Sequence, residues 1–372
     1  MNIIYISNAR IPTEWAHGLQ IMKTCEALAL SGARLELWIP DKKMDIHEDP
    51  FAYYGVKKAF PIKRFFTFDL IWLGKIGFII QSVSFALAVL PSLRRTKRDT
   101  IYCRDEIIVA LLLFFGVRDI VWESHDGSWG VFARYAAQNA RRMVVVTQGL
   151  KDFYCERGMV AGDIYVIPNG IDLKSFEHPE SGEKARARLG LPLGKKIALY
   201  IGMLEGWKGT GTLLKASSFV SSDTVIVIIG GESEQQVARL ADEYPRVRFL
   251  GFRPVRELAD NQAAADVLIL PNTGVGDISV RFTSPLKLLS YMASGRPVIA
   301  SDLPSIREVV GEKDAFLVPP DNPDALAKMI DTVLENPHDA QMRAQAARER
   351  VQEYTWEKRA QRILDALEEK TV

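Results

Sequence analysis

The stretch Phe282-Thr-Ser-Pro-Leu-Lys-Leu-Leu-Ser-Tyr-Met-Ala-Ser-Gly-Arg-Pro-Val-Ile-Ala-Ser-Asp302 lies between two apolar runs. It predicts a helix with both ends encoded: Ser284 as the N-cap, Pro285 as the first helical residue and Gly295 as the left-handed residue after the last turn. A helix that begins at the carboxyl end of a parallel strand directs its free N–H groups and its dipole at one point, which suits a nucleotide phosphate. An ordinary β-α-β connection with good caps explains the stretch equally well.

Short apolar strands alternate with helical stretches along the whole chain, and the alternation starts again near residue 196. The predicted strands are Ile3–Ser7, Arg34–Ile39, Thr100–Cys103, Ile120–Glu123, Met143–Thr147 and Ile164–Ile167, and then Lys196–Ile201, Thr224–Ile229, Arg248–Leu250, Val267–Leu270, Val298–Ala300 and Ala315–Val318. Their nearly continuous Val, Ile and Leu runs are typical of strands buried on both faces of a parallel sheet. The sequence therefore predicts an α/β protein of two doubly wound, Rossmann-like domains that face each other across a ligand cleft.

The domain borders follow from composition. Few apolar residues lie between 169 and 195, so we expect a first domain over residues 1–175 and a second over 176–352. Residues 353–372 are expected to be a C-terminal helix, because Trp356–Lys370 is amphipathic at helical spacing.

Composition narrows the class of protein. The 372 residues include 47 basic and 46 acidic side chains, so no overall field attracts nucleic acid. The three cysteines, Cys25, Cys103 and Cys155, lack a paired spacing and favour a reducing compartment over a disulfide framework or a zinc site. The N-terminus begins with a strand pattern and lacks the basic region of a signal peptide, so we expect a cytoplasmic location.

Residues 70–90 are almost entirely apolar and approach the length of a membrane span. Three interpretations are open: a buried helix of the first domain, a transmembrane helix, in which Lys75 and Gln81 would be costly, or a helix lying on an anionic bilayer. Basic residues flank the segment, and the cluster Lys63-Arg-Phe-Phe66 fits the third interpretation, as a peripheral protein on the inner face of the plasma membrane.

Glycine-containing turns in the second half are candidates for a nucleotide site. Gly202 follows a predicted strand, and Lys208 precedes Gly209-Thr-Gly211 at the start of a helix, a workable cradle for a diphosphate. Gly230 and Gly231 end the next strand and also permit close backbone approach. The competing interpretation of Lys208 is a solvated side chain in a loop.

Polar residues also follow predicted strands of the first half. His125, beside Asp126, is placed to reach a ligand, although a lone histidine is often structural. Arg104 suits the anionic group of an acceptor, and Asn169 lies in a tight turn at the domain junction. Gly18 precedes a predicted helix in the loop after the first strand, where a phosphate or a sugar could be bound.

Taken together, these segments resemble the GT-B glycosyltransferases of family 4, the glycosyl transferases group 1. The matching segments occur in the order typical of the family and are Ala16–Gln20, Glu123–Asp126, Ile167–Asp172, Gly202 with Trp207–Gly209, Gly230–Gly231, Ser284–Lys287 and Tyr291–Ala300. The resemblance covers nearly the whole chain. It implies a GT-B fold and a retaining transfer of sugar from a nucleotide diphosphate sugar, such as a UDP- or GDP-sugar, with no other cofactor.

The resemblance also implies a division of labour between the domains. The second domain would bind the donor, whose diphosphate is stabilised by Lys208 and by the amides of Ser284 and Leu286, while Gly18 approaches from the first domain. His125 would contact the transferred sugar, and the final helix would cross back to the first domain. The acceptor, a polysaccharide or a lipid-linked saccharide, would lie in the first domain, with Arg104, Asp126 and Asn169 as candidate contacts.

Two positions depart from the family pattern. The family often has two glutamates separated by seven residues, and Phe282 and Ser290 stand at those places here. In the family the second glutamate holds the ribose hydroxyls, and a serine makes one such hydrogen bond where a carboxylate accepts two. Asp277 is a candidate for the missing carboxylate that contacts the sugar. Two alternatives to a glycosyltransferase are therefore open. One is a degenerate protein that binds a nucleotide or a partner without turnover, and the other is a sugar-nucleotide epimerase. The sequence has no metal-binding motif, so we expect a metal-independent enzyme.

Overall fold

The computed structural model describes residues 1–43, 46–204, 206–231 and 233–369. The chain forms two compact units, which divide at 169/170 and 355/356, where the sequence analysis placed the borders at 175/176 and 352/353. The two segments at these borders lie side by side. Ile171 pairs with Thr355 in a parallel bridge, and the Ile171 N–H donates to the Tyr354 carbonyl at 2.8 Å. Residues 370–372 of the predicted C-terminal helix lie outside the described residues.

Unit 1 is built on a parallel sheet, which has seven strands in the described part of the chain, in the order β3-β2-β1-β4-β5-β6-β7. The strands are β1 (Asn2–Ile6), β2 (Arg34–Asp41), β3 (Ile62–Phe66), β4 (Thr100–Cys103), β5 (Ile120–Ser124), β6 (Arg142–Val145) and β7 (Ile164–Val166). The chain order reverses between β1 and β4, which are in register from Ile3 opposite Thr100. Such a reversal opens a crevice at the carboxyl ends of the two strands.

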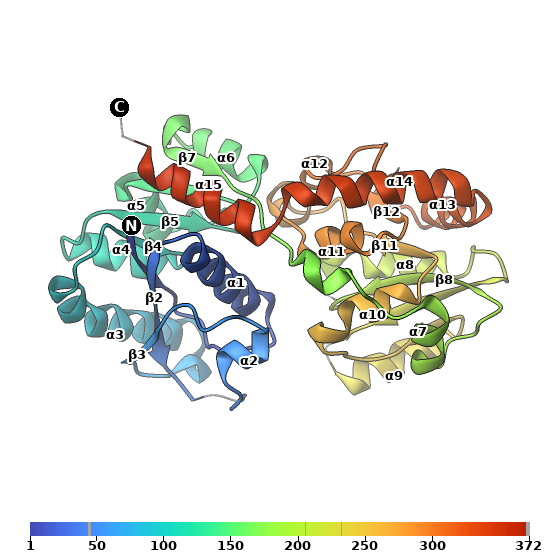
Figure 1. Ribbon diagram of the computed structural model, residues 1–372, viewed down its shortest axis with the longest axis horizontal. Helices are drawn as coiled ribbons and strands as arrows, with labels where there is room; N and C mark the ends of the chain where they lie inside the picture. The colour runs from blue at the N-terminus through green and yellow to red at the C-terminus, as the bar shows by residue number, and fades with distance from the viewer. Residues whose placement is uncertain (44–45, 205, 232, 370–372) are drawn as a thin grey trace. The chain divides into compact units, whose positions relative to one another are not determined.

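Helices connect these strands. They are α1 (Ala16–Leu30), α2 (Pro50–Tyr54), α3 (Gly74–Arg95), α4 (Glu106–Phe114), α5 (Val131–Asn139) and α6 (Gln148–Cys155), with single turns η1 (Ile71–Leu73) and η2 (Ala161–Asp163). Helices α3, α4 and α5 follow one another as packed neighbours (Figure 1). The last helix, α15 (Trp356–Glu368), belongs to unit 1 and packs against α1.

The segment from 62 to 95 differs from the sequence expectations. Residues 62–66 form the edge strand β3, which the sequence analysis missed because two charges interrupt its apolar pattern, as is common on sheet edges. Lys63 pairs with Glu36 at 2.7 Å, and Arg64 donates to the Ile11 carbonyl at 3.0 Å, so both charges have partners within the protein. The predicted buried helix is α3, preceded by η1, and only part of its surface is buried.

Unit 2 has a second parallel sheet, in the order β10-β9-β8-β11-β12-β13. Its strands are β8 (Lys196–Ile201), β9 (Thr224–Ile229), β10 (Val247–Phe249), β11 (Val267–Leu270), β12 (Val298–Ser301) and β13 (Phe316–Val318). Its helices are α7 (Gly182–Leu189), α8 (Thr210–Ala216), α9 (Glu234–Glu243), α10 (Leu258–Ala263), α11 (Leu286–Ser294), α12 (Pro304–Arg307), α13 (Pro323–Glu335) and α14 (Pro337–Arg350), with short turns η3 (Leu173–Phe176), η4 (Gly206–Lys208), η5 (Val255–Glu257) and η7 (Val351–Glu353) and a π-helix, η6 (Ile278–Phe282). The chain order reverses between β8 and β11, so the crevice of this unit is expected there.

Helix α11 is the helix predicted from the quoted stretch, and its start lies one residue later than expected. Pro285 is the N-cap, with an extended ψ of 104°, so Ser284 precedes the cap and Leu286 is the first helical residue. Gly295 has the predicted left-handed conformation, with φ of 68°. Tyr291 fixes the helix on the sheet, because its hydroxyl accepts a hydrogen bond from the Ile201 N–H at 2.9 Å.

Candidate functional site

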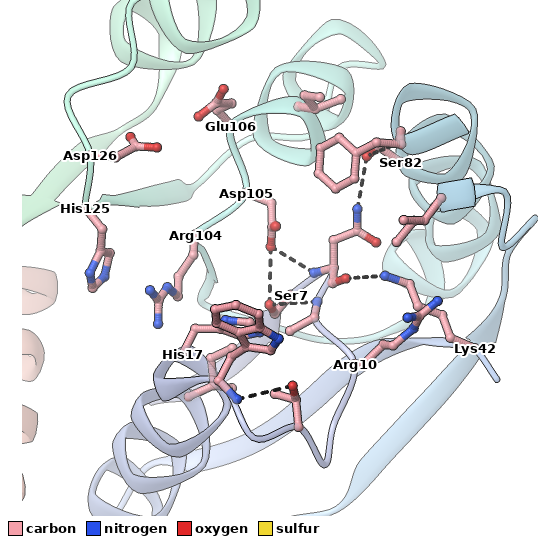
Figure 2. A pocket seen from close by; sticks show the side chains of 18 of the residues that line it. Ser7, Arg10, His17, Lys42, Ser82, Arg104, Asp105, Glu106, His125 and Asp126 are labelled. Carbon is pink, nitrogen blue, oxygen red and sulfur yellow. Dashed lines mark hydrogen bonds between the residues drawn. The ribbon is translucent and has the colours of Figure 1, made fainter. Parts of the chain in front are cut away.

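Unit 1 contains a pocket of about 750 Å³ at the carboxyl ends of β1, β4 and β5, at the reversal of strand order. The ionisable side chains that line it are Arg10, Glu14, His17, Lys42, Arg104, Asp105, Glu106, His125 and Asp126, and the apolar ones include Trp15, Ile21, Ile71 and Phe78 (Figure 2). One ligand could therefore donate hydrogen bonds from its hydroxyl groups to carboxylates and also bind an anionic group to the basic side chains.

Hydrogen bonds order the loop after β1 at the pocket floor. The buried Asp105 carboxylate accepts from the Asn8 N–H at 2.8 Å and from the Ser7 hydroxyl at 3.3 Å, and the Lys42 ammonium donates to the Asn8 carbonyl. Burial lowers the pKa of Lys42 to about 8, against the opposing charge of Asp105. One guanidinium nitrogen of Arg10, Nη2, donates to both carboxylate oxygens of Asp69, each at 2.9 Å. These bonds hold the cations of the pocket in fixed places.

His125 is held by a buried charge cluster that the sequence analysis did not predict. Its Nε2 contacts the Glu123 carboxylate, which also accepts from the Tyr102 hydroxyl and pairs with Arg359 of α15 at 2.9 Å. The Glu123 and Arg359 side chains are each only 2% exposed, so this ion pair is shielded from solvent. Arg359 also donates to the carbonyls of Ile167 and Pro168. Its sequence position gave no signal, since the contact spans more than two hundred residues.

The cluster sets the protonation of the histidine. Burial and the charge of Arg104 together lower the pKa of His125 to about 4, against the opposing effect of Glu123. Although burial alone would raise it, the charge of Arg359 and the hydrogen bond from His125 hold the pKa of Glu123 far below its usual range. The ring is therefore neutral at neutral pH, with Nε2–H donating to the carboxylate and Nδ1 left as the acceptor nitrogen.

The other predicted residues of unit 1 lie in different surroundings. Arg104 lines the pocket and donates to the Gln20 side chain at 3.1 Å, and Asp126 lines the pocket and is exposed. Asn169 is buried at the end of unit 1 and does not line the pocket. Gly18 lies inside α1 rather than before it, and a Cβ there would meet the Tyr54 hydroxyl at 2.1 Å.

In unit 2, two of the predicted glycines meet at the carboxyl ends of β8 and β9. A Cβ on Gly230 would lie 2.1 Å from the Gly202 carbonyl oxygen, and both residues have a positive φ. Gly202 is bonded through its N–H to the Ile229 carbonyl at 2.8 Å. A Cβ on Gly231 would meet the Val237 side chain at 2.7 Å. Glycine at position 230 is therefore required by close backbone packing, and glycine at position 202 is favoured by its φ of 150°.

Lys287 lies against this glycine pair and was missed as a site residue. Its ammonium donates to the Tyr200 hydroxyl at 2.7 Å, stacks over the same ring at 3.9 Å, and would lie 2.5 Å from a Cβ on Gly202. A lysine in the first turn of α11 opposes the helix dipole, which favours anions there. A lysine at the start of a helix is unfavourable unless an anion binds there. This unfavourable position was the sequence feature that could have identified Lys287 as a site residue.

Lys208 lies in η4, on the connection from β8 to α8, with its ammonium 5.2 Å from the Trp207 ring centroid. Gly209 follows in a left-handed conformation, and a Cβ there would meet the Pro271 carbonyl at 1.7 Å, so this turn is fixed on the end of β11. The structure thus places the Lys208 turn at the reversal point between β8 and β11. Asp277, the candidate replacement carboxylate, is exposed just before η6.

Ser290 faces the protein interior. It is 2% exposed, its hydroxyl donates to the Lys287 carbonyl at 2.8 Å, and it accepts from the Gln262 side chain at 2.9 Å. Phe282 is also buried. The Ser290 hydroxyl is therefore already used within unit 2. Among the described residues, no group of three or more His, Cys, Asp and Glu side chains is arranged to hold a metal ion.

Known sequences match this chain mainly in unit 2. Residues 195–336 match the model of the glycosyl transferases group 1. The D-inositol 3-phosphate glycosyltransferase of Corynebacterium urealyticum is 29% identical over 219 residues, 54% of this chain and 50% of that protein. The phosphatidyl-myo-inositol mannosyltransferase of Mycobacterium tuberculosis is 34% identical over 223 residues, 56% of this chain and 55% of that protein. The chain thus matches about half the length of these curated relatives.

Solved structures extend the likeness in fold to the whole chain. The sucrose-phosphate synthase of Thermosynechococcus elongatus superposes with a TM-score of 0.80 at 23% identity, covering 98% of this chain and 97% of that one. Anabaena HepE, solved in complex with UDP and glucose, has a TM-score of 0.76 at 20% identity and covers 99% of both chains.

The two parallel sheets, with their reversals of strand order, together with these neighbours, are those of a GT-B fold. Residues 195–336 match the glycosyl transferases group 1, in agreement with the resemblance seen in the sequence.

Proposed function

We propose that this protein is a retaining glycosyltransferase that moves a sugar from a nucleotide diphosphate sugar, such as a UDP- or GDP-sugar, to a polysaccharide or lipid-linked acceptor. One observation carries the proposal: the Lys287 ammonium is held against Gly202, in the first turn of α11. A cation, a bare backbone and helix N–H groups together suit a diphosphate whose charge grows as it leaves. Lys208 and the Leu286 amide would add to this stabilisation.

We assign unit 2 to the donor and unit 1 to the acceptor. An acceptor hydroxyl would attack the anomeric carbon on the face from which the diphosphate departs, and its proton would pass to a leaving phosphate oxygen. Neutral His125 would contact the transferred sugar through Nδ1. Arg104 and Asp126 are the acceptor-side candidates that line the pocket. In this scheme the side chains supply positioning and charge stabilisation without a metal ion.

The names of the relatives bear on the acceptor. Both act on compounds of inositol with a phosphate, one of them a phospholipid. A polyol with an anionic group suits a pocket lined by Asp126 and Glu106 as well as by Arg10, Lys42 and Arg104. We propose an acceptor of this kind and a cytoplasmic protein that binds peripherally to the inner face of the plasma membrane.

A thermal-shift screen against UDP, GDP, ADP and their sugar conjugates tests the donor site. A ligand at about one hundred times its dissociation constant stabilises the protein by about 2.7 kcal/mol. We expect one nucleotide to raise the melting temperature, and Lys287→Ala and Lys208→Ala each to reduce that rise. Lys215→Ala, an exposed lysine in the last turn of α8, is the matched control. An equal rise in all variants would place the nucleotide elsewhere.

A second candidate function rests on Ser290. Because its hydroxyl is already bonded to Lys287 and Gln262, it does not replace the ribose-binding carboxylate of the family. A protein that binds a nucleotide or a partner without turnover is consistent with this loss. Release of nucleoside diphosphate from any donor in the presence of an acceptor would exclude it.

A further inference from the structure

Helix α3 has an inverted surface in its first half. Its buried side there contains Gly77, Gln81 and Ser82, while Ile76, Ile79 and Ile80 are 69%, 40% and 38% exposed. A helix packed on the core of a water-soluble protein normally turns its apolar stripe inward. The arrangement here puts amide and hydroxyl groups inside and branched aliphatic groups outside.

Hydrogen bonds fix this orientation. The Gln81 amide donates to the Asn8 side chain at 2.8 Å, and Asn8 in turn donates to the Ser82 hydroxyl at 3.0 Å. The Thr67 hydroxyl, before η1, donates to the Gln81 carbonyl at 3.0 Å. Rotating α3 to bury its isoleucines would break these bonds, so the exposed apolar side is a stable feature of unit 1.

The exposed side continues beyond α3. Large apolar side chains between 38% and 78% exposed run from the end of β3 through η1 into α3, and we call them the apolar patch: Phe66, Phe68, Ile71, Trp72, Leu73, Ile76, Phe78, Ile79 and Ile80. Trp72 is the most exposed of them. A cluster of this size is uncommon on a protein that remains in water and marks a contact surface for a partner or a membrane.

The charge of the same segment favours an anionic partner. Residues 66–98 contain five basic side chains, Lys75, Arg94, Arg95, Lys97 and Arg98, and one acidic side chain, Asp69, which is paired with Arg10. Lys75 lies within the patch, and the other four basic side chains follow at the far end of α3. A segment that combines exposed apolar side chains with an excess of basic ones suits the interface of a bilayer with anionic lipids.

The stretch Ile71–Arg95 is long and apolar enough to cross a membrane, and 44% of its apolar window is buried within the protein. A spanning helix would have to leave β3 and α4, against which α3 packs, and give up the bonds to Asn8. The structure therefore favours contact with the membrane surface over a transmembrane span.

The patch reaches the pocket of unit 1. Ile71 and Phe78 belong to the patch and also line the pocket, whose wall includes Ser82 from the inner side of α3. Arg10 and Lys42 lie together near Asn8 in this part of the pocket (Figure 2). A lipid with its head group in the pocket would have its chains leave past Ile71 and Phe78.

We propose that the apolar patch docks unit 1 on an anionic bilayer and that the pocket takes the phosphate-bearing polyol head group of a lipid acceptor directly from that bilayer. This inference rests on the proposed function for the identity of the acceptor. The docking itself follows from the inverted helix and the charge of its segment.

Flotation with vesicles of phosphatidylcholine, alone or mixed with phosphatidylglycerol, tests the docking. We expect the full chain to float with the mixed vesicles, and the double variant Trp72→Ser with Ile76→Ser to lose about tenfold or more of its partitioning, because each substitution removes an apolar group that would be buried. Both side chains point into solvent, so the variant should keep its fold. Phe219→Ser is the control, since that side chain is 56% exposed and lies in unit 2, three residues after the end of α8.

Each outcome decides the matter. Failure of the unaltered chain to float, or equal loss in the control, would overturn the docking. A dimer in solution that the double variant dissolves would show that a second copy of the chain covers the patch, and would also overturn it. Nucleotide binding is measured on the same samples. If the chain docks on vesicles but does not bind a nucleotide, the proposed function alone is contradicted. If it binds a nucleotide but does not dock, this inference alone is contradicted.

Discussion

Replacing Arg359 by methionine should destabilise unit 1 strongly. The guanidinium pairs with the Glu123 carboxylate at 2.9 Å, with both side chains 2% exposed, and it satisfies the carbonyls of Ile167 and Pro168. A charge pair at this distance attracts by about 6 kcal/mol at an effective dielectric constant of about 20. His125 and Tyr102 remain as partners of the carboxylate, so we expect a loss near the usual about 3–5 kcal/mol for breaking a buried pair.

The pH dependence of stability gives the sign of the effect. The folded pKa of Glu123 is lowered, so its contribution to stability is present above its unfolded pKa and is lost as the pH falls toward the folded pKa. Without Arg359 the folded pKa rises toward the unfolded one. The variant should therefore lose less further stability than the unaltered chain when the pH falls below about 4.5.

Urea unfolding of both proteins, followed by circular dichroism from neutral to acidic pH, measures these quantities. Arg359→Met combined with Glu123→Gln should recover part of the loss, because the uncompensated charge is gone. Arg359→Lys is the intermediate control. A loss of unfolding free energy below about 1 kcal/mol would refute the reasoning, since about 1 kcal/mol is the value of an exposed ion pair. A double variant no more stable than Arg359→Met would refute it as well.

Three further predictions use the same assays. Gly230→Ala should unfold unit 2 at a lower temperature, because its Cβ would meet the Gly202 carbonyl at 2.1 Å, and a normal melting curve would contradict this. Burial lowers the pKa of His17 to about 4, so the folded state binds fewer protons than the unfolded state between pH 4 and 6.5; stability should rise with pH there, less so in His17→Gln. Gly18→Ala should destabilise unit 1, and less so in a Tyr54→Phe background, which removes the hydroxyl it meets; equal losses in both backgrounds would disprove the contact.

The strand pattern was predictable because buried parallel strands leave a strong local signal. Strands such as β4 and β8 have the predicted bounds. The edge strand β3 was missed, since its charges hide the apolar pattern and are paired only in the folded sheet. The start of α11 was one residue off because proline suits both the N-cap and the first turn.

The site was predictable in its backbone and less so in its side chains. Gly202 and Gly230 were found because glycine is favoured where φ is positive, and at Gly230 also because the Gly202 backbone lies so close. The contact of Arg359 with Glu123 depends on how a distant helix packs, which no local spacing encodes. The inward orientation of Gln81 likewise depends on the partner Asn8, far away in the sequence.

The most direct test of the central claim is transfer itself. The purified chain is incubated with the nucleotide sugar whose nucleotide raises its melting temperature and with anionic vesicles that contain a phosphoinositide, and both nucleoside diphosphate release and the lipid product are measured. We predict stoichiometric release and a glycosylated lipid whose new bond keeps the anomeric configuration of the donor. Nucleotide binding without release, under any combination of donor and acceptor, would contradict the account and leave a binding protein.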